Sequence, residues 1–315
     1  MRQRLGVGLA EHLYICDPID QLVAGADTTL ALARASRAAG HASNWCLMRE
    51  MAWKGDALYA QIRPFDERQE LAPGNWRKVS SQSLVFVRTD PPVDAAYLSA
   101  LWLLDAEARR GLRVVNNPAA LSWANEKTLI LNFPDLIPET LVSGDPDQIK
   151  GFVHAQQRAV IKPLDGNGGR GVLILDAQDK NLNALVDLTL EPGVPVMVQA
   201  YLPEVQHGDR RVILIDGEPR GVLNRVAGES DHRCNMHVGA QAEQVALSEQ
   251  DRLICAAIGP FLRAHGMVFT GIDIIGGKLT EINVTSPTGV EEILAGGGPD
   301  LAAETIAALS QDATN

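Results

Sequence analysis

Two patterns of hydrophobic residues follow one another along this chain, and the change between them falls near residue 122. Before that point, short apolar runs alternate with longer helical segments. Residues 84–88 have the composition of a buried strand, and Asp94 can cap a helix that ends near Arg110, just before Gly111. Alternating strands and helices are typical of an α/β domain with a mostly parallel sheet. The first part of the chain is therefore predicted to form such a domain.

Three more elements are predicted in this first part. Residues 5–9 and 114–116 are short apolar runs of the kind that form strands. Asp27 can cap a helix that runs to Ala39, and Gly40 follows directly after its end.

From residue 125 the chain is richer in short β-type runs. Gly217-Glu218-Pro219 is predicted to turn two of them into a hairpin. Strands are expected at residues 160–162, 171–175, 196–201, 211–215, 221–225, 268–275 and 279–284, and helices at residues 248–264 and 299–309. This mixture indicates an α+β arrangement.

Composition excludes several classes of partner. The chain has 315 residues, 46% of them hydrophobic and 21% charged, as in ordinary globular proteins. Its net charge of −11 argues against nucleic acid or an anionic membrane as partner. The apolar stretches fall well short of the ~20 residues that a bilayer span requires. The four cysteines have no metal-binding spacing, which fits a reducing cytoplasm. We therefore predict a cytoplasmic protein that binds neither nucleic acid nor membrane.

A glycine-rich stretch follows a lysine in the middle of the chain. Lys162 lies in an apolar run, and four glycines (Gly166, Gly168, Gly169 and Gly171) come soon after it. Such a loop can turn backbone N–H groups toward an anion, and a phosphate would compensate a buried ammonium. The lysine precedes the glycines, so this is no Walker A loop. The alternative is a solvent-facing lysine on an edge strand beside a flexible hairpin tip, and the residues alone favour neither.

A hairpin near the carboxyl end can be paired in two ways around its glycine turn. A two-residue loop would place Ile272 opposite Glu281. A three-residue loop places Ile272 opposite Ile282 and Ile274 opposite Thr280, which gives one largely apolar face. Because register follows the hydrophobic pattern, we predict the three-residue loop.

In that register, polar side chains gather on the other face of the hairpin. Asp273 lies opposite Glu281, and Asn283 is on the same side because side chains alternate with period two. Two facing carboxylates repel one another unless a positive charge lies between them. Hard oxygen ligands suit Mg²⁺ or Mn²⁺, so the sequence predicts a divalent metal site. The alternative is a hydrated polar face on an exposed hairpin.

Several arginines cluster in this otherwise acidic chain: Arg210, Arg211, Arg225 and Arg233. Arg211 and Arg225 fall on strands that a hairpin separates, so they can converge. Guanidinium groups bind carboxylates and phosphates through paired hydrogen bonds. The alternative is a role in surface solubility. The polar stretch between residues 226 and 241 is either a lid or a passive loop.

Other catalytic patterns are absent from the sequence. The seven histidines form no pair four residues apart, and there is no Gly-x-Ser-x-Gly elbow. Gly6-Val7-Gly8 lacks the third glycine of a dinucleotide-binding fingerprint. Neither a side-chain nucleophile nor a histidine metal site is predicted.

Taken together, these features resemble the bacterial glutathione synthetases of the ATP-grasp superfamily. The resemblance covers nearly the whole chain, and the motif that ends in Ser-Pro-Thr is its most specific part. The matching motifs are Asp17-Pro18-Ile19, Arg88-Thr89-Asp90-Pro91-Pro92, Asn116-Asn117-Pro118, Asn125-Glu126-Lys127, Ile161-Lys162-Pro163-Leu164-Asp165-Gly166, Gln199-Ala200-Tyr201-Leu202-Pro203, Gly208-Asp209-Arg210-Arg211-Val212 and Thr280-Glu281-Ile282-Asn283-Val284-Thr285-Ser286-Pro287-Thr288.

The resemblance implies a fold in three parts. A Rossmann-like parallel sheet would occupy residues 1–122, a central ATP-grasp lid subdomain residues 123–200, and a carboxyl-terminal ATP-grasp subdomain residues 201–315. The two ATP-grasp parts would hold ATP between them. A homo-oligomer is also expected, because members of the family are often oligomeric.

The resemblance also implies roles for individual residues. Lys127 and Lys162 would contact phosphates beneath the loop that contains Gly166, Gly168 and Gly169. Gln199, Ala200, Tyr201 and Leu202 would hold adenine, and Asp209 the ribose. Asp273, Glu281 and Asn283 would bind Mg²⁺ or Mn²⁺. The predicted substrate contacts are Arg88, Arg211, Arg225, Arg233, Asn235, Ser286, Pro287 and Thr288, and Lys162, Arg211 and Arg225 are the predicted catalytic residues.

The implied reaction joins γ-glutamylcysteine to glycine through an acyl phosphate, at the expense of ATP. Two departures from the family leave the substrates open: the loop sequence Arg233-Cys234-Asn235-Met236-His237, and the acidic pair Glu291-Glu292 after the Ser-Pro-Thr turn. A different ATP-grasp carboxylate–amine ligase is therefore the first alternative. A nucleotide-binding protein without catalysis is the second.

Overall fold

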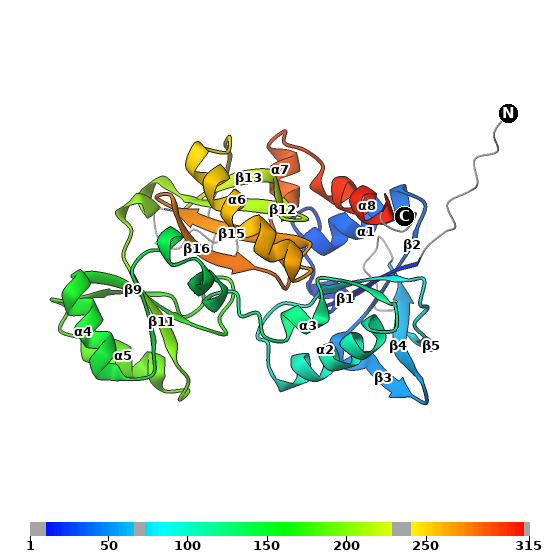
Figure 1. The fold of residues 1–315 in the computed structure, drawn as a ribbon, viewed down its shortest axis with the longest axis horizontal. Coiled ribbons are helices and arrows are strands. Elements are labelled where there is room, and N and C mark those ends of the chain that lie inside the picture. Colours follow the sequence, from blue (N-terminus) through cyan, green and yellow to red (C-terminus); the bar gives the residue numbers. More distant parts are fainter. Residues whose placement is uncertain (1–10, 66–72, 229–240, 312–315) are drawn as a thin grey trace.

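The computed structural model describes residues 11–65, 73–228 and 241–311, and they form three sheets in chain order (Figure 1). The first sheet has the strand order β3-β4-β2-β1-β6-β7, and β5 pairs with β4. Its strands are β1 (Glu11–Cys16), β2 (Ala42–Cys46), β3 (Met51–Lys54), β4 (Ala57–Pro64), β5 (Asn75–Lys78), β6 (Leu84–Arg88) and β7 (Arg113–Val115). The neighbours β2, β1, β6 and β7 run parallel, as predicted, whereas β3, β4 and β5 form an antiparallel extension that was not predicted.

The helices of this part begin at the predicted caps. In α1 (Thr28–Ala38) the Asp27 carboxylate accepts hydrogen bonds from the first turn, and in α2 (Ala95–Ala108) Asp94 does the same. These bonds satisfy backbone N–H groups that have no partner within the helix. A short helix, α3 (Pro118–Leu121), follows β7. The strand predicted at residues 5–9 lies outside the described residues.

The second sheet is antiparallel, with the order β10-β9-β11-β8. It contains β8 (Thr140–Ser143), β9 (Arg158–Pro163), β10 (Leu173–Asp176) and β11 (Val196–Ala200). Helices α4 (Pro146–Gln156) and α5 (Leu182–Leu190) pack against it, and the group has its own hydrophobic core around Val153, Ile161 and Val186. Figure 1 shows it at the left end of the molecule.

The third sheet is also antiparallel, with the order β14-β13-β12-β15-β16. Its strands are β12 (Asp209–Ile215), β13 (Glu218–Val226), β14 (Gln241–Gln244), β15 (Phe269–Ile275) and β16 (Lys278–Asn283). The accompanying helices are α6 (Glu249–Ala264), α7 (Val290–Ala295) and α8 (Leu301–Gln311), and the chain also forms the short 3-10 helices Ile19–Gln21, Met48–Glu50, Thr128–Asn132, Pro134–Leu136 and Pro203–His207. The predicted fold class is thus confirmed.

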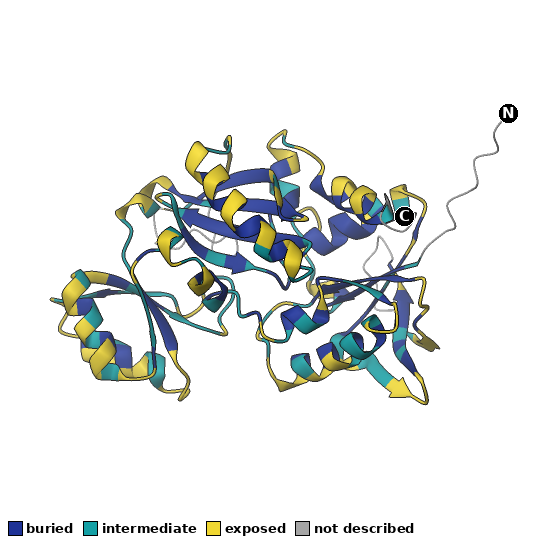
Figure 2. Ribbon diagram, viewed as in Figure 1, coloured by how far each residue is buried: buried dark blue, intermediate teal, exposed yellow. Residues whose placement is uncertain are grey.

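Helix α8 packs against α1, although the two helices are far apart in the sequence. Leu301 and Ile306 of α8 belong to the same buried cluster as Leu30 and Leu32 of α1 and Ile215 of β12. Burying apolar surface between these elements is the main force that can hold them together. In Figure 2 the strands beneath the helices are dark blue, whereas the outer faces of α4, α5 and α6 carry exposed residues. The predicted division at residues 122 and 200 stays a prediction.

One turn differs from the prediction. Strand β12 ends at Ile215 and β13 begins at Glu218, so the turn consists of Asp216 and Gly217 and not of residues 217–219. Both residues have positive φ, 51° and 70°. A two-residue turn of this kind matches the twist of the flanking strands, which explains why Asp-Gly is preferred to Gly-Glu-Pro here.

Candidate active site

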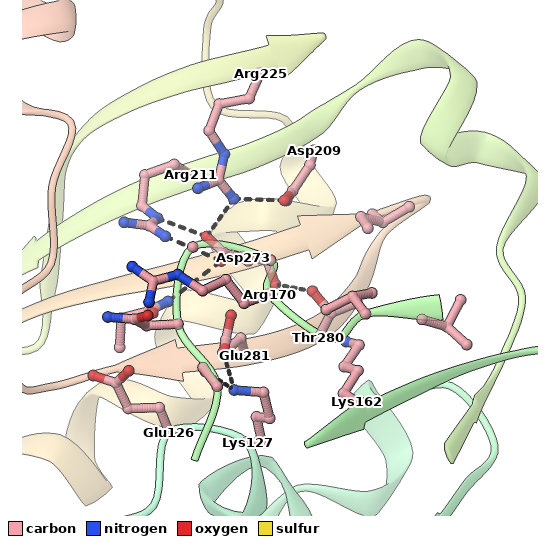
Figure 3. Close-up of a pocket in the computed structure, with 18 of the residues that line it drawn as sticks. Glu126, Lys127, Lys162, Arg170, Asp209, Arg211, Arg225, Asp273, Thr280 and Glu281 are labelled. Carbon is pink, nitrogen blue, oxygen red and sulfur yellow. Dashed lines mark hydrogen bonds and ion pairs between the residues drawn. The ribbon is translucent and has the colours of Figure 1, made fainter. Parts of the chain in front are cut away.

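A cavity of about 440 Å³ opens between the second and third sheets (Figure 3). The second sheet contributes Lys162 and Gln199, and the glycine loop lies beside them. Asp273 and Glu281 of the third sheet line the cavity as well, together with the segment after β16. The remaining predicted residues on its wall are Lys127, Gly166, Gly168, Gly169, Ala200, Tyr201, Leu202, Asp209, Arg211, Arg225, Asn283, Ser286, Pro287 and Thr288.

The polar face of the β15–β16 hairpin forms as predicted, but its turn does not. Asp273 pairs with Glu281 and Ile272 with Ile282, whereas Ile274 faces Leu279 and not Thr280. The turn is the two-residue Gly-Gly loop, and the register shifts by one residue next to Asp273. A β-bulge accommodates one extra residue, so the preferred tight turn and the apolar pairing can coexist. The predicted three-residue loop is wrong for this reason.

Arg211 and Arg225 converge on Asp273. Arg211 forms two bonds to this carboxylate, with Nε–Oδ1 at 2.6 Å and Nη2–Oδ2 at 3.1 Å, and Arg225 Nη2 lies 2.9 Å from Oδ1. Asn283 donates to Oδ2 at 3.3 Å. Burial alone would raise the pKa of Asp273, but the two guanidinium charges hold it well below its usual range. The carboxylate is therefore ionised and paired in this structure.

Asp209 shares Arg225 with Asp273. Its Oδ2 lies 2.5 Å from Arg225 Nη2, and burial raises the pKa of Asp209 to about 6, an effect that the Asp273 charge reinforces and Arg225 opposes. Within the described residues, Asp209 Oδ1 and Arg225 Nε are buried and have no hydrogen-bond partner. Buried polar atoms are normally satisfied, so these two are available to a bound group.

Two lysines reach the cavity from different segments. Lys127 Nζ lies 3.3 Å from Glu281 Oε1 and donates a hydrogen bond to the carbonyl oxygen of Gly166. Lys162 Nζ donates to Gln199 Oε1 at 2.8 Å, and burial lowers the pKa of this ammonium. Strand β9 lies between β10 and β11, so the edge-strand alternative for Lys162 is wrong. The side chain of Gln199 thus fixes a lysine in this structure, whereas adenine binding by residues 199–202 stays a prediction.

The glycine loop carries an arginine to which the sequence analysis assigned no role. Arg170 lies between Gly169 and Gly171, which have φ of 76° and 71°, and its side chain points into the cavity (Figure 3). A cation inside a glycine loop of an acidic chain was the signal that could have identified it.

The segment after β16 is anchored from several sides. Arg88 Nη2 donates to the Pro287 carbonyl at 3.0 Å, and Arg211 Nη1 donates to the Thr288 carbonyl at 3.0 Å. Ser286 Oγ donates to Asp90. Arg88 is buried and is not among the described residues that line the cavity, so it contacts the segment from behind. The remaining predicted contacts, Arg233 and Asn235, lie outside the described residues.

The donor set of the hairpin fits the predicted metal. Two carboxylates and one amide, from Asp273, Glu281 and Asn283, supply the oxygen ligands that Mg²⁺ prefers. In the part of the chain that the structure describes, no three His, Cys, Asp or Glu side chains are grouped as a metal site. The predicted set has only two such side chains, with an amide as the third ligand, so the metal stays a prediction.

Comparison with known families decides the affiliation of the chain. The family model of the prokaryotic glutathione synthetase N-terminal domain matches residues 11–122, and that of the prokaryotic glutathione synthetase ATP-grasp domain matches residues 126–297. The chain belongs to the prokaryotic glutathione synthetase family. Membership in the glutathione synthetase family confirms the resemblance found in the sequence and makes the chain an ATP-dependent ligase.

Individual relatives cover most of the chain. A glutathione synthetase of Synechococcus elongatus is 41% identical over 316 residues, covering 94% of this chain and 97% of the relative. A glutathione synthetase of Nostoc is 42% identical over 312 residues, covering 93% and 95%.

Solved structures support the fold. D-cycloserine synthetase superposes with a TM-score of 0.67 at 18% identity, covering 96% of this chain and 99% of that one. An ATP-grasp ligase complexed with a minimal precursor gives a TM-score of 0.64 at 19% identity, covering 95% and 98%. None of the helices in the described ranges is both long and apolar enough to cross a membrane.

Proposed function

We propose that this chain joins γ-glutamylcysteine to glycine with hydrolysis of ATP to ADP and phosphate. The observation that carries the proposal is that two lysines, the glycine loop, the oxygen-rich hairpin face and an arginine pair meet in one cavity. The relatives that match over nearly their whole length are named glutathione synthetases, which supports this choice of substrates.

The reaction proceeds in two steps in this proposal. A carboxylate oxygen of γ-glutamylcysteine attacks the γ-phosphorus of ATP, and the bond to ADP breaks, giving an acyl phosphate. The glycine amine then attacks the acyl carbon, loses a proton, and phosphate leaves. Such chemistry needs alignment and charge neutralisation more than a protein nucleophile.

Lys127, Lys162 and Arg170 bring positive charge to the phosphate end of the cavity in this proposal. Lys127 precedes the 3-10 helix Thr128–Asn132, Lys162 lies on β9, and Arg170 comes from the glycine loop itself. The glycine loop covers the phosphates and excludes water, which would otherwise hydrolyse an acyl phosphate.

Asp273, Glu281 and Asn283 hold Mg²⁺ or Mn²⁺ in this proposal. The ion supplies charge neutralisation for the phosphate oxygens when it is bound. Arg211 and Arg225, which contact Asp273 in this structure, are then the cations nearest to the ligand carboxylate. We assign them to the substrate carboxylate and the developing acyl phosphate, next to Ser286, Pro287 and Thr288.

The acidic pair Glu291-Glu292 does not face the cavity and therefore does not conflict with these substrates. Acidic residues facing the cavity would repel a substrate carboxylate, but Glu291 forms an ion pair with Arg34 of α1. Neither Glu291 nor Glu292 is among the described residues that line the cavity. The acidic pair therefore does not argue for a different acceptor.

ADP release tests the proposal directly. Purified protein with ATP and Mg²⁺ is given γ-glutamylcysteine and glycine together, then each alone, and the peptide product is identified by mass. We expect ADP and glutathione in equal amounts only when both substrates are present. Turnover only with another acid and amine would favour the alternative ligase, and ATP binding without any turnover would favour the non-catalytic alternative. The oligomeric state and the cytoplasmic location stay predictions.

A further inference from the structure

A glutamate that the proposed reaction does not use receives three hydrogen bonds from the segment after β16. Glu126 Oε1 accepts from Val284 N at 2.8 Å, Thr285 N at 2.9 Å and Thr285 Oγ1 at 2.8 Å. Its backbone carbonyl also accepts from Ile282 N at 3.0 Å. One residue from the start of the ATP-grasp region thus accepts hydrogen bonds from three positions at and just after the end of β16, namely 282, 284 and 285.

Placing the charged carboxylate of Glu126 at this position without a cation costs free energy. Glu126 forms no ion pair among the described residues, and the neighbouring Lys127 pairs with Glu281. Burial and the nearby Glu281 charge raise the pKa of Glu126, while the bonds from Thr285 and Val284 oppose that rise. Glu126 is half-buried and lines the cavity, and a carboxylate without a cation in such a place is stabilised mainly by the donors that surround it. The donors of residues 284 and 285 therefore stabilise the charge of Glu126, and the same hydrogen bonds fix the position of these two residues.

The neighbours of Glu126 attach the same segment to the glycine loop. Asn125 Nδ2 donates to the Leu164 carbonyl at 2.8 Å, and Lys127 donates to the Gly166 carbonyl. The three consecutive residues 125–127 consequently contact the glycine loop, Glu281 of the hairpin face and the segment after β16. Figure 3 shows Glu126 and Lys127 side by side at the lower edge of the site.

The residues that follow the Glu126 contact form a wall of the cavity. Val284 and Thr285 are buried, and Ser286, Pro287 and Thr288 come directly after them. A shift of the two anchored residues would therefore move the cavity wall. Displacements of about 1 Å at such positions can cost ~100-fold in rate.

We propose that Glu126 is a positioning residue that fixes residues 284–288 relative to the glycine loop, and so fixes the amino-acid substrates relative to the phosphates. The inference rests on the proposed function for the identity of those substrates. Glu126 acts here through the backbone that it holds, and its carboxylate does not take part in the chemistry.

Three variants and one control test this role. Glu126→Ala removes the acceptor, Glu126→Gln keeps an acceptor oxygen, and Thr285→Val removes only the hydroxyl donor. Glu304→Ala is the control, because Glu304 is an exposed glutamate on α8. The measurements are kcat, the KM of γ-glutamylcysteine and of glycine, and the Kd of ADP with Mg²⁺.

We expect Glu126→Ala to raise the KM of at least one amino-acid substrate about tenfold or more, and to leave the Kd of ADP within about threefold. Glu126→Gln should stay within about threefold of the unmodified protein, and Thr285→Val should shift the same KM in the same direction by less. If Glu126→Ala does not fold, the Glu126→Gln and Thr285→Val values decide. Unchanged KM values in Glu126→Ala would overturn the proposal. So would a rise in the Kd of ADP as large as the rise in KM, or a Glu126→Gln protein as impaired as Glu126→Ala.

Amide hydrogen exchange separates this inference from the proposed function. If the unmodified protein does not turn over γ-glutamylcysteine and glycine, the proposed function fails, and exchange still reports on the anchor. We expect faster exchange at residues 284 and 285 in Thr285→Val and Glu126→Ala, with exchange in β6 unchanged. Equal protection at residues 284 and 285 in all variants would refute the anchoring role.

Discussion

Asp273 and Arg211 face each other across neighbouring strands of the third sheet and are joined by two hydrogen bonds, Nε–Oδ1 at 2.6 Å and Nη2–Oδ2 at 3.1 Å. A bidentate pair of this kind has defined geometry as well as strength. Arg225 adds a second cation to the same carboxylate. Any metal bound by Asp273 would therefore share the carboxylate with two guanidinium groups.

Asp273→Asn tests both aspects of this pair. Removing one partner of a buried ion pair leaves uncompensated charge, which typically costs 3–5 kcal/mol, and the retained amide should lower the loss to about 2–4 kcal/mol. We also expect at least 100-fold lower turnover. Urea denaturation and ADP release measure the two effects. A variant with unchanged stability would show that the arginines do not depend on this carboxylate.

Glu281→Gln should affect metal dependence more than folding. Glu281 has a partly exposed side chain, and its Oε1 lies 3.3 Å from Lys127 Nζ, so loss of this ion pair should cost about 1 kcal/mol or less. Losing a ligand carboxylate should raise the Mg²⁺ concentration for half-maximal ADP release by about tenfold or more. A Mg²⁺ titration at saturating ATP provides the measurement. The same half-maximal concentration in both proteins would exclude Glu281 as a ligand.

Lys162→Met should weaken nucleotide binding. The substitution keeps the apolar stem but removes the ammonium that Gln199 holds in the cavity. We expect the Kd of ATP, measured by calorimetry, to rise about tenfold or more. Lys180→Met is the control, since Lys180 is exposed and does not line the cavity. Equal affinities in the two variants would leave Lys162 with no role in binding phosphate.

His12 should make the stability depend on pH. Its ring stacks on His41 with centroids 4.3 Å apart, and Nδ1 lies 2.7 Å from Ser36 Oγ. Burial, together with the charges of His41 and Arg113, lowers the pKa of His12 from 6.5 to about 4. Between these values the unfolded chain binds the proton and the folded protein does not, so stability must fall as the pH drops from about 6.5 toward 4.

The size of this effect is set by the pKa shift. A shift of this magnitude corresponds to at most about 3.4 kcal/mol of stability. Urea denaturation at several pH values, compared with His12→Gln, measures it. The variant should lose less stability over this pH window than the unmodified protein. Parallel curves for the two proteins would assign the acid sensitivity to other groups.

The sequence predicts best where a local rule and the tertiary structure agree. Asp27 and Asp94 cap their helices because a carboxylate next to free N–H groups acts within a few residues. The pairing of Asp273 with Glu281 followed from the apolar pattern, although the tight Gly-Gly turn required a bulge that the pattern does not encode. The bulge allows both the tight Gly-Gly turn and the pairing of Asp273 with Glu281, and only the structure reveals it.

Long-range pairs could not be found in this way. Arg34 and Glu291 come from opposite ends of the chain, and no spacing rule connects them. The contact of Glu126 with residues 284 and 285 is equally remote in sequence. The antiparallel strands β3, β4 and β5 were missed because their apolar residues do not alternate clearly with polar ones. Such contacts are set by the packing of the whole chain.

The packing of α8 on α1 also constrains how the protein is made. The apolar side of α1 is synthesised early, but Leu301 and Ile306, which share its buried cluster, are synthesised only after the three sheets. During translation the amino-terminal layer must therefore wait with part of its apolar surface exposed to water and to chaperones. Completion of this layer must therefore follow the synthesis of all three sheets and of α8 itself.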